Sequence, residues 1–419
     1  MDTRIHPASG IALLPQLSLW EVPPTQESVE QDFEHELRPI STFSSSTPIR
    51  FELKNPSNEY VNLSETYLSI KLKFKLTQSA AITAADWKKV KLAPNLLHSL
   101  FKHVGIEIAG KQLAPSPSLY AFRSYFSQLL GFSKTAKDGF LDSIGWKITD
   151  LDKLTNSGEL NLDLLGVLNT DLNFQEKWIV GGTDLTIELI PNPVSFYAKC
   201  DSAQKIECEF TDCSLFVSRN RVSNALEGAH EKALRSAPCR YPFVRTDVRA
   251  MTLAPGANDY ILDNVATGFL PRRIFISFLK ASDFYTDPYN FKPCGLNYLV
   301  AYQDGMQVPT KPFTPNFKDK TVTREFVAFY RALNQNNTDP ILVFNKEAWS
   351  LSPIFGINFS PDQSPGVSAG SHVNHKRLGH LRLHVRFDEA VKDALIALIF
   401  MEFDSVLEID GLRNIHVSY

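Results

Sequence analysis

The chain has 419 residues, more than one ordinary hydrophobic core organises, so its length predicts about two domains. Hydrophobic residues make up 43% and charged residues 21%, as in a globular protein, and the 29 Phe and 13 Tyr favour strands and interfaces. The formal net charge is −3, which excludes a general electrostatic attraction to DNA or RNA. Sequence-specific nucleic-acid binding is therefore not expected.

Residues 1 to about 48 are rich in Pro, Ser, Thr and Glu, and their apolar side chains are isolated. These apolar side chains include Leu17, Leu19, Trp20 and Val22. Such a segment cannot build a core of its own. We therefore expect an extended arm that becomes ordered only against another surface. The apolar run at residues 11–14 is short, follows no basic run and ends at Pro15, so no secretory signal peptide is expected.

Strand patterning begins after this arm. From Leu68 to Leu76, apolar and polar residues alternate completely, which predicts a strand with one buried and one wet face. Asp184–Ile190 and Lys205–Phe210 repeat this scheme. Between the first two strands, Ser118–Leu130 places apolar residues at helical spacing, which predicts a helix with Ser118 as its N-cap.

The second half has a similar pattern. The polar, weakly helical stretch Asn224–Ser236 is interpreted as a connector. Beyond it we expect a strand, a hairpin, an aromatic helix, another strand and a last pair of strands, in that order. These elements span Arg273–Leu279, Tyr298–Val308, Arg324–Leu333, Leu381–Phe387 and Leu395–Ile409. The polar stretches 132–178 and 360–375 are expected to be loops. Short strands with one clear helix per half indicate all-β sandwiches.

The longest apolar run and the cysteines indicate whether the chain is expected to span a membrane and to form disulfides. The longest apolar run, Ala394–Met401, is far below the ~20 residues of a membrane helix and predicts a buried strand, so no membrane span is expected. The five cysteines are odd in number and lack CxxC spacing, which predicts free thiols in a reducing compartment. They are Cys200, Cys208, Cys213, Cys239 and Cys294.

One phrase occurs twice and indicates a duplication. Ile106–Leu113 and Val300–Val308 each read as a strand, a Gly-containing tight turn and a returning strand. The turn glycines, Gly110 and Gly305, are separated by nearly half the chain, and a Pro-rich loop then leads into an aromatic helix in both halves. A repeat of this period predicts two copies of one domain rather than a solenoid.

A match to a nucleophile elbow occurs at residues 366–370. Gly366, Ser368 and Gly370 fit the GxSxG pattern, and His372 is nearby. An elbow needs a buried strand before the serine and a helix after it, whereas Pro- and Ser-rich sequence flanks this motif. We interpret the match as a coincidence within a loop.

Four histidines close together suggest zinc. They are His372, His375, His380 and His384. The last two share the polar face of a predicted strand with Arg382 and Arg386, whose charges repel a divalent cation. Because no Cys or carboxylate joins the set, a solvated or interface face is favoured over a metal site.

Two further patterns fall short of a site. His230–Leu234 begins like the zinc motif HExxH, but Leu stands where the second histidine ligand belongs. Lys71, Lys73 and Lys75 form a basic strand face without interleaved aromatic residues, which favours a solvated or subunit-contact surface over phosphate binding. No catalytic, cofactor-binding or metal-binding residue is therefore assigned, and we do not expect an enzyme.

A set of short phrases spans nearly the whole chain in order. They are Leu19–Ser28, Arg38–Ser41, Pro48–Glu52, Glu59–Leu63, Leu97–Phe101, Gly110–Leu113, Asp287–Phe291, Asn297–Leu299, Asp304–Pro309 and Glu402–Asp410. Together they resemble the hexon-type major capsid proteins of adintoviruses and of Polinton (Maverick) elements. The stretch between about 132 and 178 resembles them least.

The resemblance implies a double jelly roll, with two tandem eight-stranded sandwiches, short helices in loops and an extended N-terminal arm. The expected limits are 1–48 for the arm, 49–222 and 241–419 for the two jelly rolls and 223–240 for the connector. It also implies a homotrimeric, pseudo-hexagonal capsomer that tiles an icosahedral shell around a double-stranded DNA genome. The expected partners are copies of the chain, neighbouring capsomers and penton or minor capsid proteins. The expected location is the virion, assembled inside the host cell.

Two alternatives stay open. Jelly rolls also build carbohydrate-binding and glycan-processing proteins, which need an aromatic platform or paired carboxylates. Glu402 and Asp404, two positions apart on the last predicted strand, are the candidate pair. The other alternative is a penton-type minor capsid protein. Such proteins resemble a single jelly roll, so the duplication argues against this alternative.

Overall fold

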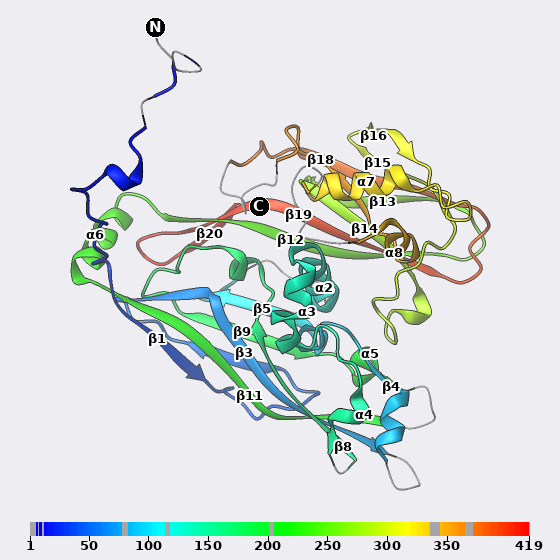
Figure 1. The fold of residues 1–419 in the computed structure, drawn as a ribbon, viewed down its shortest axis with the longest axis horizontal. Coiled ribbons are helices and arrows are strands. Elements are labelled where there is room, and N and C mark those ends of the chain that lie inside the picture. Colours follow the sequence, from blue (N-terminus) through cyan, green and yellow to red (C-terminus); the bar gives the residue numbers. More distant parts are fainter. Residues whose placement is uncertain are drawn as a thin grey trace.

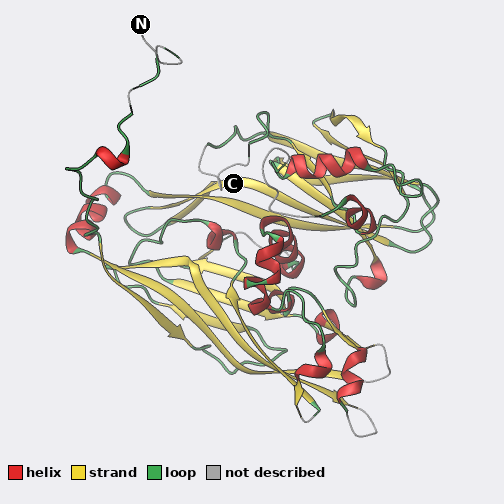
Figure 2. Cartoon of the chain, viewed as in Figure 1, coloured by secondary structure: helices red, strands yellow, loops and turns green. Residues whose placement is uncertain are grey.

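The computed structural model describes residues 6, 8–10, 12–77, 83–113, 118–156, 158–200, 205–335, 344–364 and 372–418. Strands dominate the fold, and the helices are short segments between them (Figure 2). The chain forms two strand-rich halves that lie side by side, the first coloured blue to green and the second green to red (Figure 1).

Each half is a jelly roll, because the two halves share one strand order. Numbered along the chain within a half, one sheet has the order first, eighth, third, sixth, and the other has the order second, seventh, fourth, fifth. In the first half these eight strands are β1 (Val29–Leu37), β2 (Ile49–Leu53), β3 (Glu59–Thr77), β5 (Phe101–Ile108), β6 (Lys111–Gln112), β8 (Glu159–Val167), β9 (Leu185–Pro191) and β11 (Lys205–Val222). In the second half they are β12 (Cys239–Leu253), β13 (Asp259–Phe269), β14 (Arg273–Lys280), β15 (Leu296–Gln303), β16 (Met306–Phe313), β17 (Phe355–Asn358), β18 (Leu378–Phe387) and β19 (Leu395–Ile409). The expected tandem of eight-stranded sandwiches is confirmed.

Short accessory elements decorate this frame. The accessory strands are β4 (Val90–Leu92), which pairs with β10 (Ala198–Cys200), β7 (Thr155–Asn156) and β20 (Ile415–Ser418). The α-helices are α1 (Leu96–Ser99), α2 (Tyr120–Gly131), α3 (Lys134–Asp138), α4 (Leu151–Leu154), α5 (Val194–Tyr197), α6 (Asn224–Leu234), α7 (Thr323–Ala332) and α8 (Lys346–Leu351). The 3₁₀ turns are η1 (Pro15–Leu17), η2 (Ala84–Lys89), η3 (Phe140–Ile144), η4 (Asp171–Phe174) and η5 (Ala281–Asp283).

The repeated phrase forms the same hairpin in both halves. β5 and β6 are joined by Ala109 (φ 46°) and Gly110 (φ 78°), and β15 and β16 by Asp304 (φ 49°) and Gly305 (φ 83°). Two consecutive positive φ angles are the requirement of the type I′ turn, which explains the glycine in each phrase. Each hairpin is followed by its aromatic helix, α2 or α7, so the predicted duplication is confirmed.

Several strand predictions are also confirmed. Along β3 the expected inward residues from Leu68 to Leu76 are all buried, and their neighbours are more exposed. β9 alternates in the same way over its seven residues. Packing against the sandwich interior, rather than local propensity, explains this alternation.

The arm was predicted to be too long. Residues 29–37 form β1, which pairs with β11 from Val29 to Leu37 and is the first strand of the first jelly roll. The sequence pattern did not reveal this strand, because its outward residues are charged and only Val29, Phe33 and Leu37 are partly buried. The predicted N-cap is also wrong, since Leu119 is the N-cap of α2 and no side chain caps it.

Two other expectations are wrong. Residues 132–178 are not simply a loop, because β8 pairs with β3 over nine positions, and its alternating Leu160, Leu162 and Leu164 carried the missed signal. Leu395–Ile409 is one continuous strand rather than a pair. In the stretch 360–375, the described residues form neither helix nor strand, and the GxSxG motif lies outside the described residues.

Candidate functional site

Helix α2 lies between the two jelly rolls and binds them to each other (Figure 1). Nine of its twelve residues are buried. Phe122 stacks on Phe284 with ring centroids 4.9 Å apart, and Phe126 stacks on both Phe291 and Phe400 at 5.5 Å. Each such aromatic pair contributes about 0.5–1.5 kcal/mol beyond area burial. The contact between the halves is therefore apolar and tightly packed.

Tyr289 fixes the position of this aromatic cluster. Its ring stacks on Tyr125 with centroids 4.1 Å apart. Its hydroxyl lies 2.8 Å from the Ser99 hydroxyl and donates to the Ala121 carbonyl oxygen at 3.3 Å. Burial raises the pKa of the Tyr125 phenol to about 12, so both rings stay neutral. These aromatic contacts were not predicted from the sequence, although four aromatic residues among the first seven of α2 were a signal of an aromatic contact.

An ion pair closes one end of the contact. Arg123 of α2 donates to the Asp171 carboxylate at 2.6 Å, and both side chains are nearly buried. The same Asp171 oxygen accepts the backbone N–H of Thr246 at 2.9 Å. Thr246 belongs to β12, an edge strand, so a side chain of the first jelly roll satisfies an unpaired edge group of the second.

A groove of about 680 Å³ lies beside this ion pair, between the halves. Apolar side chains from both halves line it, among them Ile106, Leu113, Leu119, Phe243 and Met251. Its carboxylates are Asp171 and Asp247, and each is paired with an arginine. Burial raises the pKa of Asp247. The groove thus offers mainly apolar surface, and its carboxylates are held in ion pairs.

The connector helix α6 fixes the other end. Tyr60 of β3 lies with its hydroxyl 2.9 Å from His230 Nδ1, and Glu231 accepts from Arg413 at 2.5 Å. His230 and Glu231, the first two residues of the incomplete HExxH pattern, therefore connect α6 to the first jelly roll and to the turn between β19 and β20. Their role is structural.

The three lysines on the basic face of β3 form ion pairs with carboxylates on the neighbouring strands. Their amines lie within ion-pair distance of carboxylates on β11 and β8. The pairs are Lys71–Asp212 at 3.6 Å, Lys73–Glu159 at 2.6 Å and Lys75–Glu209 at 3.1 Å. Because each lysine already has an anion, this face offers no concentrated positive charge to a phosphate backbone.

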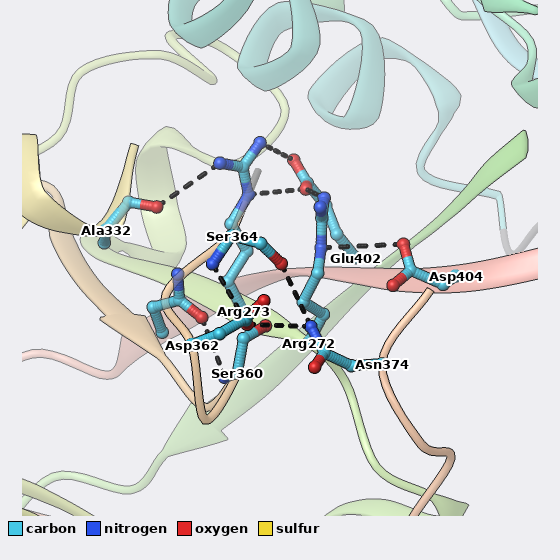
Figure 3. A network of polar contacts seen from close by, with 10 residues as sticks. Arg272, Arg273, Ala332, Ser360, Asp362, Ser364, Asn374, Glu402 and Asp404 are labelled. Atoms are coloured by element: carbon cyan, nitrogen blue, oxygen red, sulfur yellow. Dashed lines mark hydrogen bonds and ion pairs between the residues drawn. The ribbon is translucent and has the colours of Figure 1, made fainter. Parts of the chain in front are cut away.

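The candidate carboxylate pair is buried among arginines (Figure 3). Glu402 accepts from Arg272 at 2.7 Å and from Arg273 at 2.5 Å and 3.0 Å, and Asp404 lies 3.7 Å from Arg272. Burial alone would raise the pKa of Glu402, but the two guanidiniums lower it overall. Glycoside hydrolysis needs one carboxyl with a raised pKa and access to the substrate. The geometry of this pair fits a structural network instead.

The histidines are dispersed. His384 Nε2 lies 2.6 Å from Asp259, which also binds Arg386, and His372 Nε2 lies 2.5 Å from Asp362. In the part of the chain that the structure describes, no three His, Cys, Asp or Glu side chains are arranged to hold a metal ion. All five cysteines are free thiols.

No helix among the described residues is long and apolar enough to span a membrane. No family model matches the chain. A curated relative, the uncharacterised protein F54H12.2 of Caenorhabditis elegans, is 25% identical over 403 residues and covers 89% of this chain and 94% of its own length.

Solved structures from viruses have the same fold. A chain of the Sputnik virophage has a TM-score of 0.64 at 12% identity, covering 100% of this chain and 94% of its own. The Faustovirus major capsid protein has 0.62 at 10% identity, covering 96% and 93%. The mavirus major capsid protein has 0.55 at 11% identity, covering 98% and 95%. The chain therefore has the double jelly-roll fold of viral major capsid proteins.

Proposed function

We propose that the chain is a major capsid protein of the adintovirus and Polinton (Maverick) group. The duplicated fold carries this proposal, because one chain presents two copies of one strand order held in a fixed relation by α2. The short phrases from Leu19–Ser28 to Glu402–Asp410 support the group assignment. The nematode relative, alike over nearly its whole length, is consistent with a gene carried in an animal genome.

The proposed assembly is a homotrimer. Three chains with two similar domains each present six similar sides, so threefold symmetry imitates sixfold symmetry in a flat tile. Such capsomers would tile an icosahedral shell around a double-stranded DNA genome, with penton or minor capsid proteins as further partners. The proposed location is the virion, after assembly inside the host cell.

We place the first jelly roll at residues 29–222 and the second at 239–418, with α6 as the connector. The short arm before residue 29 carries exposed apolar side chains that suit contact with a neighbouring molecule. They are Leu13, Leu14, Leu17, Leu19, Trp20 and Val22. No ligand chemistry enters this proposal: Glu402 and Asp404 lie among arginines, and His372 and His384 each lie against an aspartate.

The test is the mass and shape of the purified protein. Sedimentation and light scattering at micromolar concentration should give three times the 47.1 kDa of one chain, and negative-stain images should show pseudo-hexagonal particles. A single-chain mass under these conditions would overturn the proposal. A truncation after residue 222 should lose the tile, whereas a penton-like protein would keep its assembly.

A further inference from the structure

The helix and the edge strand that form the contact between the two halves each have an equivalent on the outer surface of the molecule. Within the chain, α2 and η4 of the first jelly roll lie against β12 of the second. Because both halves share one strand order, α7 corresponds to α2, and β1 corresponds to β12. These two counterparts lie on opposite sides of the molecule, α7 on the outer side of the second half and β1 on the outer side of the first (Figure 1).

Helix α7 has one buried and one exposed face. Glu325, Phe329 and Ala332 are buried against its own jelly roll. Arg324, Val327 and Arg331 are exposed, and their spacing of three and four places them on one helix face. We call these three residues the α7 stripe. Val327 is 53% exposed, although it is apolar and lies in the middle of the stripe.

The outer edge strand β1 is acidic. Glu30, Asp32, Glu34 and Glu36 are all exposed. Alternation along the strand places Asp32, Glu34 and Glu36 on one side, and Glu30 lies at a register shift at the start of the strand. We call these four residues the β1 row. The residues of β11 opposite Asp32 and Glu34 are Asn220 and Ser218, which carry no charge. Glu36 is the member that pairs with an arginine, Arg38, at 2.7 Å.

We infer that the α7 stripe of one copy docks on the β1 row of the next copy. The contact repeats between chains the relation that α2 has to β12 within a chain. This inference rests on the proposed trimer and names its interface. A head-to-tail contact of this kind closes into a ring when the rotation between copies is threefold.

The difference in chemistry between the two helices fits their different roles. α2 never leaves its partner, so its outer face is aromatic and permanently buried. α7 faces water until the chains meet, so a charged stripe keeps the single chain soluble. Two arginines facing four carboxylates give complementary charge, which guides association and excludes wrong orientations. Val327 supplies apolar contact between them.

Charge reversal tests the pairing. Val327→Glu with Arg331→Glu makes the stripe net negative. Asp32→Lys with Glu34→Lys reverses the charge at the two central positions of the row and leaves Glu30 and Glu36 in place. Arg324 is kept, because it donates to the backbone carbonyls of Lys311 and Pro312. Matched controls are Lys232→Glu on the exposed side of α6 and Glu389→Lys in an exposed turn. Circular dichroism and urea unfolding establish that each variant folds.

The measurement is the concentration at which half of the trimer dissociates, followed by sedimentation at roughly 0.1 M and 0.5 M salt. Each double reversal should raise this concentration about tenfold or more, since it brings like charges together at the interface. Combining both reversals should recover most of the lost affinity, and neither control should change the concentration of half-dissociation. Added salt should weaken the wild type and the combined variant, in which opposite charges meet, and should reduce the defect of each double reversal, in which like charges meet.

The outcomes separate this inference from the proposed function. A wild-type trimer that both reversals leave unchanged, or that the combined variant fails to restore, would overturn the inference while the trimer stands. A wild type that stays a single chain at micromolar concentration would overturn the proposed trimer, and the inference with it.

Discussion

Tyr125 of the first jelly roll and Tyr289 of the second stack with ring centroids 4.1 Å apart and planes 19° from parallel. Tyr289 adds hydroxyl contacts to Ser99 and to the Ala121 carbonyl, both in the first half. This pair holds α2 against both sandwiches. The proposed trimeric tile needs such a fixed relation, because a hinge between the halves would change the arrangement of its six similar sides.

The stacked tyrosines predict a graded loss of stability. Tyr289→Ala should cost roughly 3–5 kcal/mol of unfolding free energy, because it leaves a cavity in a dry aromatic cluster. Tyr289→Phe keeps the stack and loses only the hydroxyl contacts, so it should cost about 0.5–1.5 kcal/mol. Urea unfolding measures both. Tyr285→Ala is the matched control. Tyr285 is 61% exposed and its ring contacts the edge of the cluster at Phe284, so its loss should cost no more than about 1.5 kcal/mol. Equal losses at positions 285 and 289 would contradict the assignment.

The buried network of Glu402, Arg272 and Arg273 predicts that a substitution of similar size lowers the free energy of unfolding strongly. Glu402→Gln removes one charge and leaves Arg272 and Arg273 buried without their main anion. Breaking a buried pair in this way should cost roughly 3–5 kcal/mol. Glu408→Gln on the same strand is the control. Its partner Arg240 is 64% exposed, so that change should cost less than about 1 kcal/mol. Denaturant midpoints of the two variants decide the matter, and similar midpoints would refute the prediction.

The duplication could be predicted from sequence because it rests on turn chemistry. Gly110 and Gly305 occupy positions with positive φ, and only a few residue types suit them, so the two hairpins leave the same mark. The strand from Leu68 to Leu76 could be predicted because one of its faces is buried and the other is wet. Both signals are local.

Other features depend on contacts that local pattern does not record. β1 has three partly buried residues in nine, because an edge strand is held mainly by backbone hydrogen bonds to β11. Glu402 and Asp404 looked like a wet pair, because the arginines that surround them come from the β14 region, well over a hundred residues away. The stacking of Tyr125 on Tyr289 joins the two domains and has no sequence period.

The buried histidine of α1 predicts acid sensitivity. His98 is 1% exposed, and its Nδ1 lies 2.9 Å from the Tyr120 hydroxyl. That hydroxyl also accepts the Asn169 backbone N–H at 3.0 Å, and His98 Nε2 has no hydrogen-bond partner. Burial lowers the pKa of His98 to about 3. The folded protein therefore keeps this imidazole neutral.

The sign of the effect follows from proton binding. Below about pH 6.5, the ordinary pKa of a histidine in the unfolded chain, His98 binds a proton in the unfolded state and stays neutral in the folded state. This contribution to stability is complete above about pH 6.5 and is lost as pH falls towards 3, which amounts to roughly 2 kcal/mol by pH 5. Urea unfolding between pH 7.5 and 5 should show this slope, and His98→Gln should flatten it by that amount. His35→Gln, at an exposed position of β1, should leave the slope unchanged. A slope that survives in His98→Gln would show that other groups cause the acid sensitivity.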